Sequence, residues 1–123
     1  MRFRGGPLSV SRSLFSGNGT GIRPYKGLGE FQENVITANE IGIFVRDGGE
    51  GVAIHRNNIY GNDRYNIRLG DFNLENVDAR ENWWGEGPPA DSLFDGRKEP
   101  GVGMVIFEPF LDKPVDIPIP GDR

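Results

Sequence analysis

The stretch Asn57-Asn58-Ile59-Tyr60-Gly61-Asn62 decides the fold, because variants of the same phrase return along the chain. Asn34-Val35-Ile36-Thr37-Ala38-Asn39 precedes it, and the shorter copy Asn82-Trp83-Trp84-Gly85 follows it. The earliest copy, Ser13-Leu14-Phe15-Ser16-Gly17-Asn18, has Ser in the first Asn position. The four copies are therefore 34 − 13 = 21, 57 − 34 = 23 and 82 − 57 = 25 residues apart. A repeat of this length indicates a stacked solenoid.

Each copy contains three short runs of apolar residues, which predict three strands. Apolar residues alternate before the aligned position, at Leu8, Gly29, Val52 and Val77 and then at Val10, Phe31, Ile54 and Ala79. This period of two is typical of a strand with one buried face. After a sharp bend at the Asn, a second strand points Phe15, Ile36, Ile59 and Trp84 inward, and third strands follow at Ile22, Ile43 and Ile67.

Three strands in each copy predict three parallel sheets around a narrow apolar core. Four coils, stacked at about 4.8 Å per coil, span roughly 20 Å. The connecting residues 25–28, 46–51 and 70–76 differ in length, so they absorb the drift in the period. The aligned residues Asn34, Asn57 and Asn82 are expected to form an internal amide ladder, whose first rung Ser13 should weaken.

Composition narrows the class of protein. The chain has the length of one domain, 123 residues, with 36% apolar residues, 19 glycines and 9 prolines, which fits many turns between short strands. A net charge of −4 offers no basic surface for nucleic acid. The absence of cysteine excludes disulfides and thiolate metal sites. No apolar run is long enough for a secretion signal or a membrane span.

The two ends of the repeat carry different expectations. Trp84 should plug the end of the core, within a closing coil at residues 82–111 that is followed by a Pro-rich extended tail at residues 112–123. An alternative interpretation makes Trp83 and Trp84 a platform for sugar stacking. The other end lacks a complete coil and a cap, which suggests the C-terminal part of a longer β-helix. We expect self-association there, as a homo-oligomer through Phe3, Leu8, Val10, Phe15 and Ile22.

These residues resemble the right-handed parallel β-helix proteins of the pectate-lyase-like superfamily, and within it the NosD-like or right-handed β-helix region proteins. The resemblance covers about residues 3–111. Its most specific part is Asn82-Trp83-Trp84-Gly85 with Gly87-Pro88-Pro89 and residues 105–111, which is similar to the closing coil of many extracytoplasmic members. The resemblance implies an all-β, right-handed single-stranded parallel β-helix and a periplasmic or secreted parent protein. It implies little about activity, because the fold carries many functions.

In enzymes of this fold the chemistry usually lies on the face of the third strand and its adjacent loops. The outward residues there form a candidate glycan groove, with Arg23, Tyr25, Phe44, Asp47, Arg68 and Asp71 as binding residues. Asp47 and Asp71 are 24 residues apart, about one coil, but no further Asp accompanies them as a calcium-assisted lyase would need. A solvated face is the plainer interpretation, and we assign no catalytic residue.

Metal and cofactor sites are not expected. Copper, which the NosD-like name suggests, needs several His, Cys or Met ligands, whereas the chain has one histidine and two methionines. His55 is predicted to be a surface residue. The sequence therefore favours a non-catalytic structural or carbohydrate-associated module with polysaccharide as a candidate partner. The alternative is a polysaccharide-active enzyme, a lyase or glycoside hydrolase, that uses the groove on the third-strand face.

Overall fold

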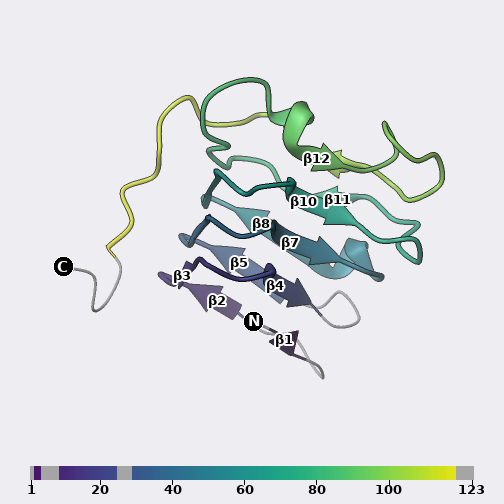
Figure 1. Cartoon of the computed structure of the whole chain (residues 1–123), viewed down its shortest axis with the longest axis horizontal. Helices are drawn as coiled ribbons and strands as arrows, with labels where there is room; N and C mark the ends of the chain where they lie inside the picture. Colours follow the sequence, from purple (N-terminus) through teal and green to yellow (C-terminus); the bar gives the residue numbers. More distant parts are fainter. Residues whose placement is uncertain (1, 4–8, 25–28, 119–123) are drawn as a thin grey trace.

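The structure of the protein, a computed structural model, describes residues 2–3, 9–24 and 29–118, with the backbone only for residues 2 and 3. Its strands pair in parallel and stack into a β-solenoid of about four turns with almost no helix (Figure 1). The predicted all-β parallel solenoid is therefore confirmed.

The strands form three sheets, each of which takes one strand from each turn. The first sheet contains β1 (Arg2–Phe3), β4 (Thr20–Pro24), β7 (Ile41–Val45), β10 (Tyr65–Leu69) and β12 (Leu93–Phe94). The second contains β2 (Ser9–Ser11), β5 (Gly29–Gln32), β8 (Val52–His55), β11 (Val77–Asp78) and β13 (Val105–Ile106). The third contains β3 (Leu14–Phe15), β6 (Val35–Thr37) and β9 (Asn58–Tyr60). Two 3-10 helices, η1 (Gly49–Gly51) and η2 (Pro89–Ser92), lie in the connections.

Apolar side chains stack in columns inside the solenoid, because parallel pairing places equivalent residues above one another. Ile43 is paired with Ile22 on one side and with Ile67 on the other, and Ile36 lies between Phe15 and Ile59 in the third sheet. The inward residues of the middle turns are fully buried. Removing this apolar surface from water is the main stabilising contribution to such a fold.

The sharp bends lie one residue before the asparagines. Arg12, Glu33, Arg56 and Glu81, which precede Ser13 and the three aligned asparagines, all have positive φ angles between 53° and 64°. A left-handed conformation costs a non-glycine residue roughly 1–2 kcal/mol. Its recurrence at the same position of four turns marks it as a regular part of the repeat.

Both ends of the stack differ from its middle. Val10 and Phe15 are half-buried and Leu14 is 47% exposed, whereas Ile22 is fully buried. Leu8 and the Phe3 side chain, also expected at this end, lie outside the described residues. At the other end the tail runs back past the third sheet (yellow in Figure 1), where the Asn58 side chain exchanges two hydrogen bonds with the backbone of Val115, at 2.8 and 2.9 Å.

Within the described part of the chain, no helix is long and apolar enough to cross a membrane.

Candidate functional site

The first asparagine ladder runs from turn to turn inside the bend between the second and third sheets. Asn34 Nδ2 donates to Asn57 Oδ1 at 3.1 Å, and Asn57 Nδ2 donates to Asn82 Oδ1 at 3.0 Å. Each Oδ1 also accepts the backbone N–H of the residue one turn earlier, and Ser13 N–H enters the ladder in this way at 3.1 Å. The three asparagines are fully buried, so the ladder satisfies polar groups that water cannot reach.

A second ladder, which the sequence interpretation missed, occupies the next bend. Asn39 Nδ2 donates to Asn62 Oδ1 at 3.0 Å, and Asn18 N–H donates to Asn39 Oδ1 at 3.0 Å. The spacings, 39 − 18 = 21 and 62 − 39 = 23, equal those of the first ladder. Gly21 and Gly42 lie under the amides of Asn39 and Asn62, where an added Cβ would come within 2.9 Å of the Nδ2 atoms. The sequence contains a signal for this ladder: each asparagine of the second ladder lies over a glycine of the neighbouring strand, Asn39 over Gly21 and Asn62 over Gly42.

The second ladder ends one turn before the first. One more step of 25 residues from Asn62 reaches Gly87, which has no side chain to continue it. Asn66, which occupies the position of Gly21 and Gly42 in its own turn, replaces the missing rung. Asn62 Nδ2 donates to Asn66 Oδ1 at 2.8 Å, and Asn66 Nδ2 donates to Ser92 Oγ at 2.9 Å. The polar chain thus leaves the ladder and ends on η2.

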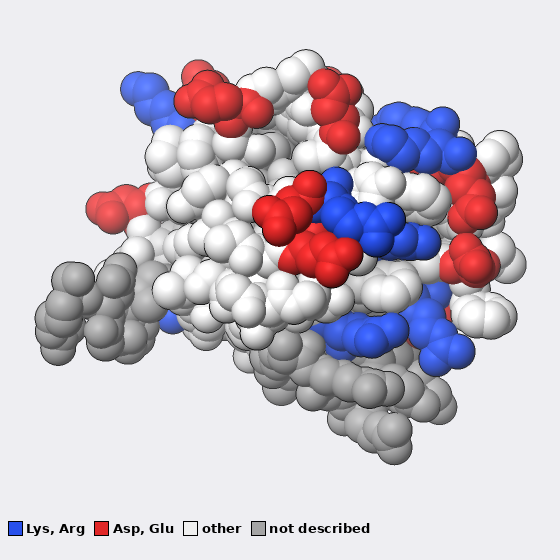
Figure 2. All heavy atoms as spheres, viewed as in Figure 1, with Lys and Arg blue, Asp and Glu red and all other residues white. Residues whose placement is uncertain are grey.

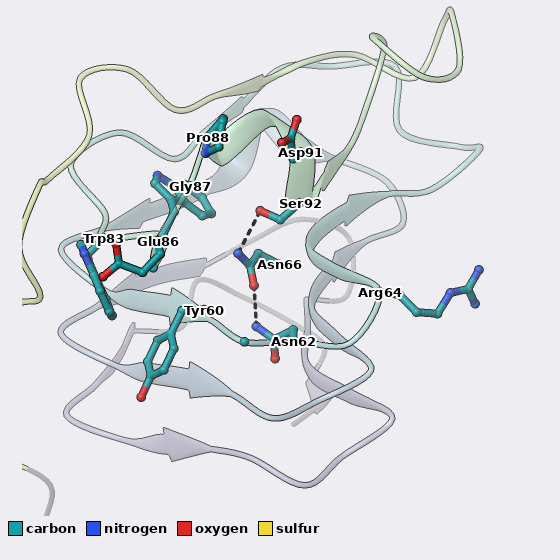
Figure 3. A pocket seen from close by; sticks show the side chains of 13 residues that line it. Tyr60, Asn62, Arg64, Asn66, Trp83, Glu86, Gly87, Pro88, Asp91 and Ser92 are labelled. Carbon is teal, nitrogen blue, oxygen red and sulfur yellow. Dashed lines mark hydrogen bonds between the residues drawn. The ribbon is translucent and has the colours of Figure 1, made fainter.

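A hollow of about 500 Å³ opens where the second ladder ends, and we call it the ladder-end hollow (Figure 3). Residues of two successive turns line it: Tyr60, Gly61, Asn62, Arg64, Asn66, Trp83, Trp84, Gly85, Glu86, Gly87, Pro88, Asp91 and Ser92. The hydrogen-bonded chain of Asn62, Asn66 and Ser92 crosses it, while the Arg64 side chain points away from it (Figure 3). The hollow exists because residues 85–92 leave the path of the solenoid.

Two aromatic side chains form one wall of the ladder-end hollow. The rings of Tyr60 and Trp83 have centroids 5.0 Å apart and are tilted by 55°. Both side chains come from the outward face of the third sheet, where Asn58 forms an isolated bridge with Trp83. Both are half-buried, so each keeps part of its surface open to solvent. Gly85 lies against Tyr60 with φ of 82°, in a place where a Cβ would come within 2.9 Å of Tyr60 Cβ.

The two adjacent tryptophans have different environments. Trp84 is 4% exposed and packs in the core of the last turn, and its Nε1 has no hydrogen-bond acceptor among the described residues. Trp83 instead lies on the outer surface beside Glu86, whose side chain points toward it (Figure 3). The carboxylates of Glu86 and Asp91 and the peptide groups of residues 85–88 therefore supply the polar part of the site.

The other candidates from the sequence lie on the outer face of the first sheet, which contains the third strand of each coil. Arg23 and Arg68 come from strands on opposite sides of β7, and their guanidinium carbons lie 5.0 and 5.8 Å from the centre of the Phe44 ring. Arg68 also lies 4.7 Å from the ring of Phe94, a member of this stack that the sequence interpretation missed. Arginine and phenylalanine thus alternate across four strands through cation–π contacts.

The remaining groove residues are not brought together with this stack. Asp47 lines one small hollow, with Phe72 and Glu75, and Asp71 lines another, with Glu99. Tyr25 lies outside the described residues. No three His, Asp or Glu side chains of the described chain gather closely enough to hold a metal ion.

His55 lies in a small charged cluster on the outer face of the second sheet. Its Nε2 is 3.0 Å from Asp78 Oδ1, and Arg80 contacts the same carboxylate through Nε at 2.8 Å and Nη2 at 2.9 Å. Hydrogen bonding to Arg80 holds the pKa of the Asp78 carboxyl well below its usual range, with a smaller contribution from His55. This cluster lies on the outer face of the sheet and lines none of the three hollows.

Comparison of the chain with models of protein families, with curated proteins and with solved structures finds no match.

Proposed function

We propose that the protein is a non-catalytic β-solenoid module that binds carbohydrate in the ladder-end hollow. The aromatic wall formed by Tyr60 and Trp83 is the observation that carries this proposal. Half-buried aromatic rings beside hydrogen-bonding groups offer the two kinds of contact that a sugar needs, an apolar surface for its C–H face and partners for its hydroxyls.

The size and polarity of the hollow support this ligand class. Its volume of about 500 Å³ falls inside the range of roughly 300–1,000 Å³ that is usual for small-molecule sites. Glu86 and Asp91 can accept hydrogen bonds from hydroxyl groups. The two carboxylates favour a neutral or amino sugar over a uronic acid, because like charges repel at short range.

The outer face of the first sheet, which carries the third strand of each coil, is a weaker candidate for sugar stacking. The ring of Phe44 lies between the guanidinium groups of Arg23 and Arg68, so neither of its faces is free. Arg68 in turn lies between two phenylalanine rings. The inner members of this stack, Phe44 and Arg68, are thus in contact on both sides with other residues of the protein, and we interpret the stack as a structural element.

We further infer that the chain is a divergent relative of the pectate-lyase-like β-helix proteins, and within them of the NosD-like group. Support comes from three parallel sheets, from ladders of asparagine at the bends and from the Asn82-Trp83-Trp84-Gly85 ending. An extracytoplasmic parent protein agrees with both this relationship and a carbohydrate ligand.

A glycan-array screen followed by calorimetry tests the proposed function. We expect Trp83→Ala and Tyr60→Ala each to weaken binding by about tenfold or more, because each removes half of the aromatic wall. Phe44→Ala and Arg68→Ala are matched controls on the other face and should bind normally. Loss of binding in these controls but not in Trp83→Ala would move the site to the third-strand face. No binding to any glycan would contradict the proposal.

The enzyme alternative has its own readout. Glu86 and Asp91 line the same hollow, so a glycan found in the screen should be incubated with the protein and followed by mass spectrometry. We expect the glycan to remain intact. Cleavage that disappears in Glu86→Gln would show a glycoside hydrolase or lyase in place of a binding module.

We also propose self-association through the edge that β2 and β3 leave open in the described part of the chain, since β4 is already paired with β1. The support is that Leu14 is 47% exposed and that Val10 and Phe15 are less buried than their counterparts one turn away. Light scattering coupled to chromatography should show a dimer whose fraction falls in Leu14→Ser. A monomer at all concentrations would contradict this.

A further inference from the structure

The loop between β10 and β11, residues 70–76, exposes two large apolar side chains. Phe72 is 67% exposed and Leu74 is 74% exposed. The other exposed large apolar residues of the described chain, Leu14, Ile106 and Phe110, are between 39% and 47% exposed. Apolar side chains that are clustered and strongly exposed mark interaction sites more often than scattered ones do.

This exposure is built into the loop by the residue between the two apolar side chains. Asn73 is fully buried, and its Oδ1 accepts the backbone N–H of Gly49 at 2.7 Å. Its Nδ2 donates to the carbonyl groups of Glu75 at 2.7 Å and Val102 at 3.1 Å. Because Asn73 is anchored inward, Phe72 and Leu74 are held outward. A preformed surface of this kind loses little conformational entropy when a partner binds.

Acidic groups surround the two exposed side chains. Leu74 separates two hollows of about 370 and 330 Å³; Asp47 and Glu75 line the first, and Asp71 and Glu99 line the second. No Lys or Arg lines either hollow within the described chain. None of these four carboxylates has an ion-pair partner among the described residues, and Glu99 Oε2 is buried without a hydrogen-bond donor.

One arginine beside this surface, Arg46, is already engaged. The guanidinium carbon of Arg46 lies 5.1 Å from the centre of the Phe72 ring. Figure 2 shows acidic side chains along the right-hand edge, where the connections after β10 and β12 lie in Figure 1, with Lys or Arg side chains above and below them. The surface therefore combines apolar anchors with carboxylates that form no ion pair among the described residues.

We propose that Phe72 and Leu74, with Asp47, Asp71, Glu75 and Glu99, form a docking surface for a segment of a partner protein that carries apolar side chains and Lys or Arg. The apolar side chains of the partner enter the two hollows beside Leu74, and its cations pair with the carboxylates. Complementary charge gives such an interface its specificity and its association rate. An anionic membrane surface is disfavoured, because the same carboxylates repel it.

Synthetic peptides of defined composition test this surface directly. The probe is a labelled peptide in which Leu and Lys alternate, and the matched peptides replace all Lys by Glu or all Leu by Ser. Fluorescence anisotropy should show that the Leu/Lys peptide binds at least about tenfold more tightly than either matched peptide. Added salt should weaken this binding, because charge pairs at a solvent-exposed rim are screened.

Variants locate the binding on the protein. We expect Phe72→Ser and Leu74→Ser each to weaken binding of the Leu/Lys peptide about tenfold, and Asp71→Asn with Glu75→Gln to reduce its salt dependence. Leu14→Ser removes an exposed apolar side chain at the other end and should bind the peptide normally. All of these residues are exposed or half-buried, so thermal unfolding should confirm that each variant is folded.

Three outcomes would overturn the proposal. They are equal affinity for all three peptides, an unchanged affinity in Phe72→Ser and Leu74→Ser, and an equal loss in Leu14→Ser. Vesicles of anionic lipid, used as a second probe, should not bind. Vesicle binding that disappears in Phe72→Ser would assign the surface to membranes and would also overturn it.

Discussion

The two asparagine ladders lie in neighbouring bends of the same turns and end differently. The first continues through Asn34, Asn57 and Asn82 to the last turn. The second ladder stops at Asn62, whose side chain donates to Asn66, which in turn donates to Ser92. Residues 85–92 leave the path of the solenoid next to this point. The ladder-end hollow opens at the second ladder and not at the first. In this protein a cavity arises where a repeating hydrogen-bond ladder lacks its next rung.

Asn57→Ala against Asn62→Ala is the strongest test of this comparison. Asn57 makes side-chain hydrogen bonds in both directions and is fully buried, so its loss should lower the free energy of unfolding by about 3–4 kcal/mol. Asn62 is only half-buried, so loss of its side chain should lower the free energy of unfolding by about 1–2 kcal/mol. Urea unfolding measures both. An equal effect would mean that the end of the second ladder is no weaker than the middle of the first.

Asn66→Gly tests whether Asn66 is the substitute rung. The variant restores the glycine found at positions 21 and 42 but removes one hydrogen bond each from Asn62 Nδ2, which keeps Ile36 O, and from Ser92 Oγ, which keeps Pro89 O. We expect a loss of about 2 kcal/mol in the free energy of unfolding. Asn76→Gly is the control and should lose less, because Asn76 is exposed and its side chain accepts one hydrogen bond, from Met104 N–H at 3.1 Å. A stability equal to that of the natural chain would show that this hydrogen bond is dispensable.

Gly85→Ala should damage the hollow more than the fold. Its φ of 82° and the 2.9 Å approach to Tyr60 Cβ require both strain and displacement of Tyr60, for a total of about 1–2 kcal/mol. Gly17→Ala is the matched control, because Gly17 has φ of 72° but nothing within 4 Å of an added Cβ. Thermal unfolding together with binding of any glycan identified should separate them. The idea fails if both variants bind equally well.

Ser13→Asn should lengthen the first ladder by one side-chain rung. Ser13 Oγ now donates to Ser11 O at 3.1 Å, and only its backbone N–H reaches Asn34. An asparagine amide could donate to Asn34 Oδ1 as the other rungs do, which should raise the free energy of unfolding by about 1 kcal/mol. Urea unfolding measures the change. A decrease would indicate that this bend differs from those of the later turns.

The smallest expected effect is a pH dependence outside both ladders. The pKa of Asp78 is lower in the folded state, so its contribution is present above the unfolded pKa of about 3.9 and is lost as pH falls through and below that value. Asp78 is partly exposed, so the effect should be a fraction of the total acid destabilisation. Comparing Asp78→Asn with the natural chain between pH 5 and 2 measures it. Identical curves would exclude any contribution.

The sequence predicted the solenoid well because its evidence is periodic. Phe31, Ile54 and Ala79 recur at fixed distances from an asparagine, and any parallel stack must bury them together. It placed the sharp bend at the asparagine, whereas the left-handed residue is the one before it, since backbone angles leave no trace in residues such as Arg56. The spacing of Asn18, Asn39 and Asn62 already contains the second ladder, but the predicted ladder contains only Asn34, Asn57 and Asn82.

The candidate site was harder to predict because it lies where the repeat fails. Asp47 and Asp71 are one coil apart in sequence, yet they line different hollows, because the loops between the first and second sheets diverge. The sequence offers Trp83 as a sugar platform together with Trp84, whereas the structure pairs it with Tyr60. The bridge between Asn58 and Trp83 brings these two rings together, whereas the hollow beside them depends on the route of residues 85–92, which no spacing rule describes. Phe94 escaped notice for the same reason, since η2 shifts its distance from Arg68.

The substitute rung has a consequence for how such a molecule can grow. A duplicated turn inserted ahead of Asn62 would bring both of its asparagines and would satisfy its own amides. The hollow would then keep its distance from the C-terminal end, because Asn66 and Ser92 terminate the second ladder locally. The number of coils and the ladder-end hollow are therefore structurally independent of each other. Coils could be added or removed ahead of Asn62 while the hollow keeps its lining.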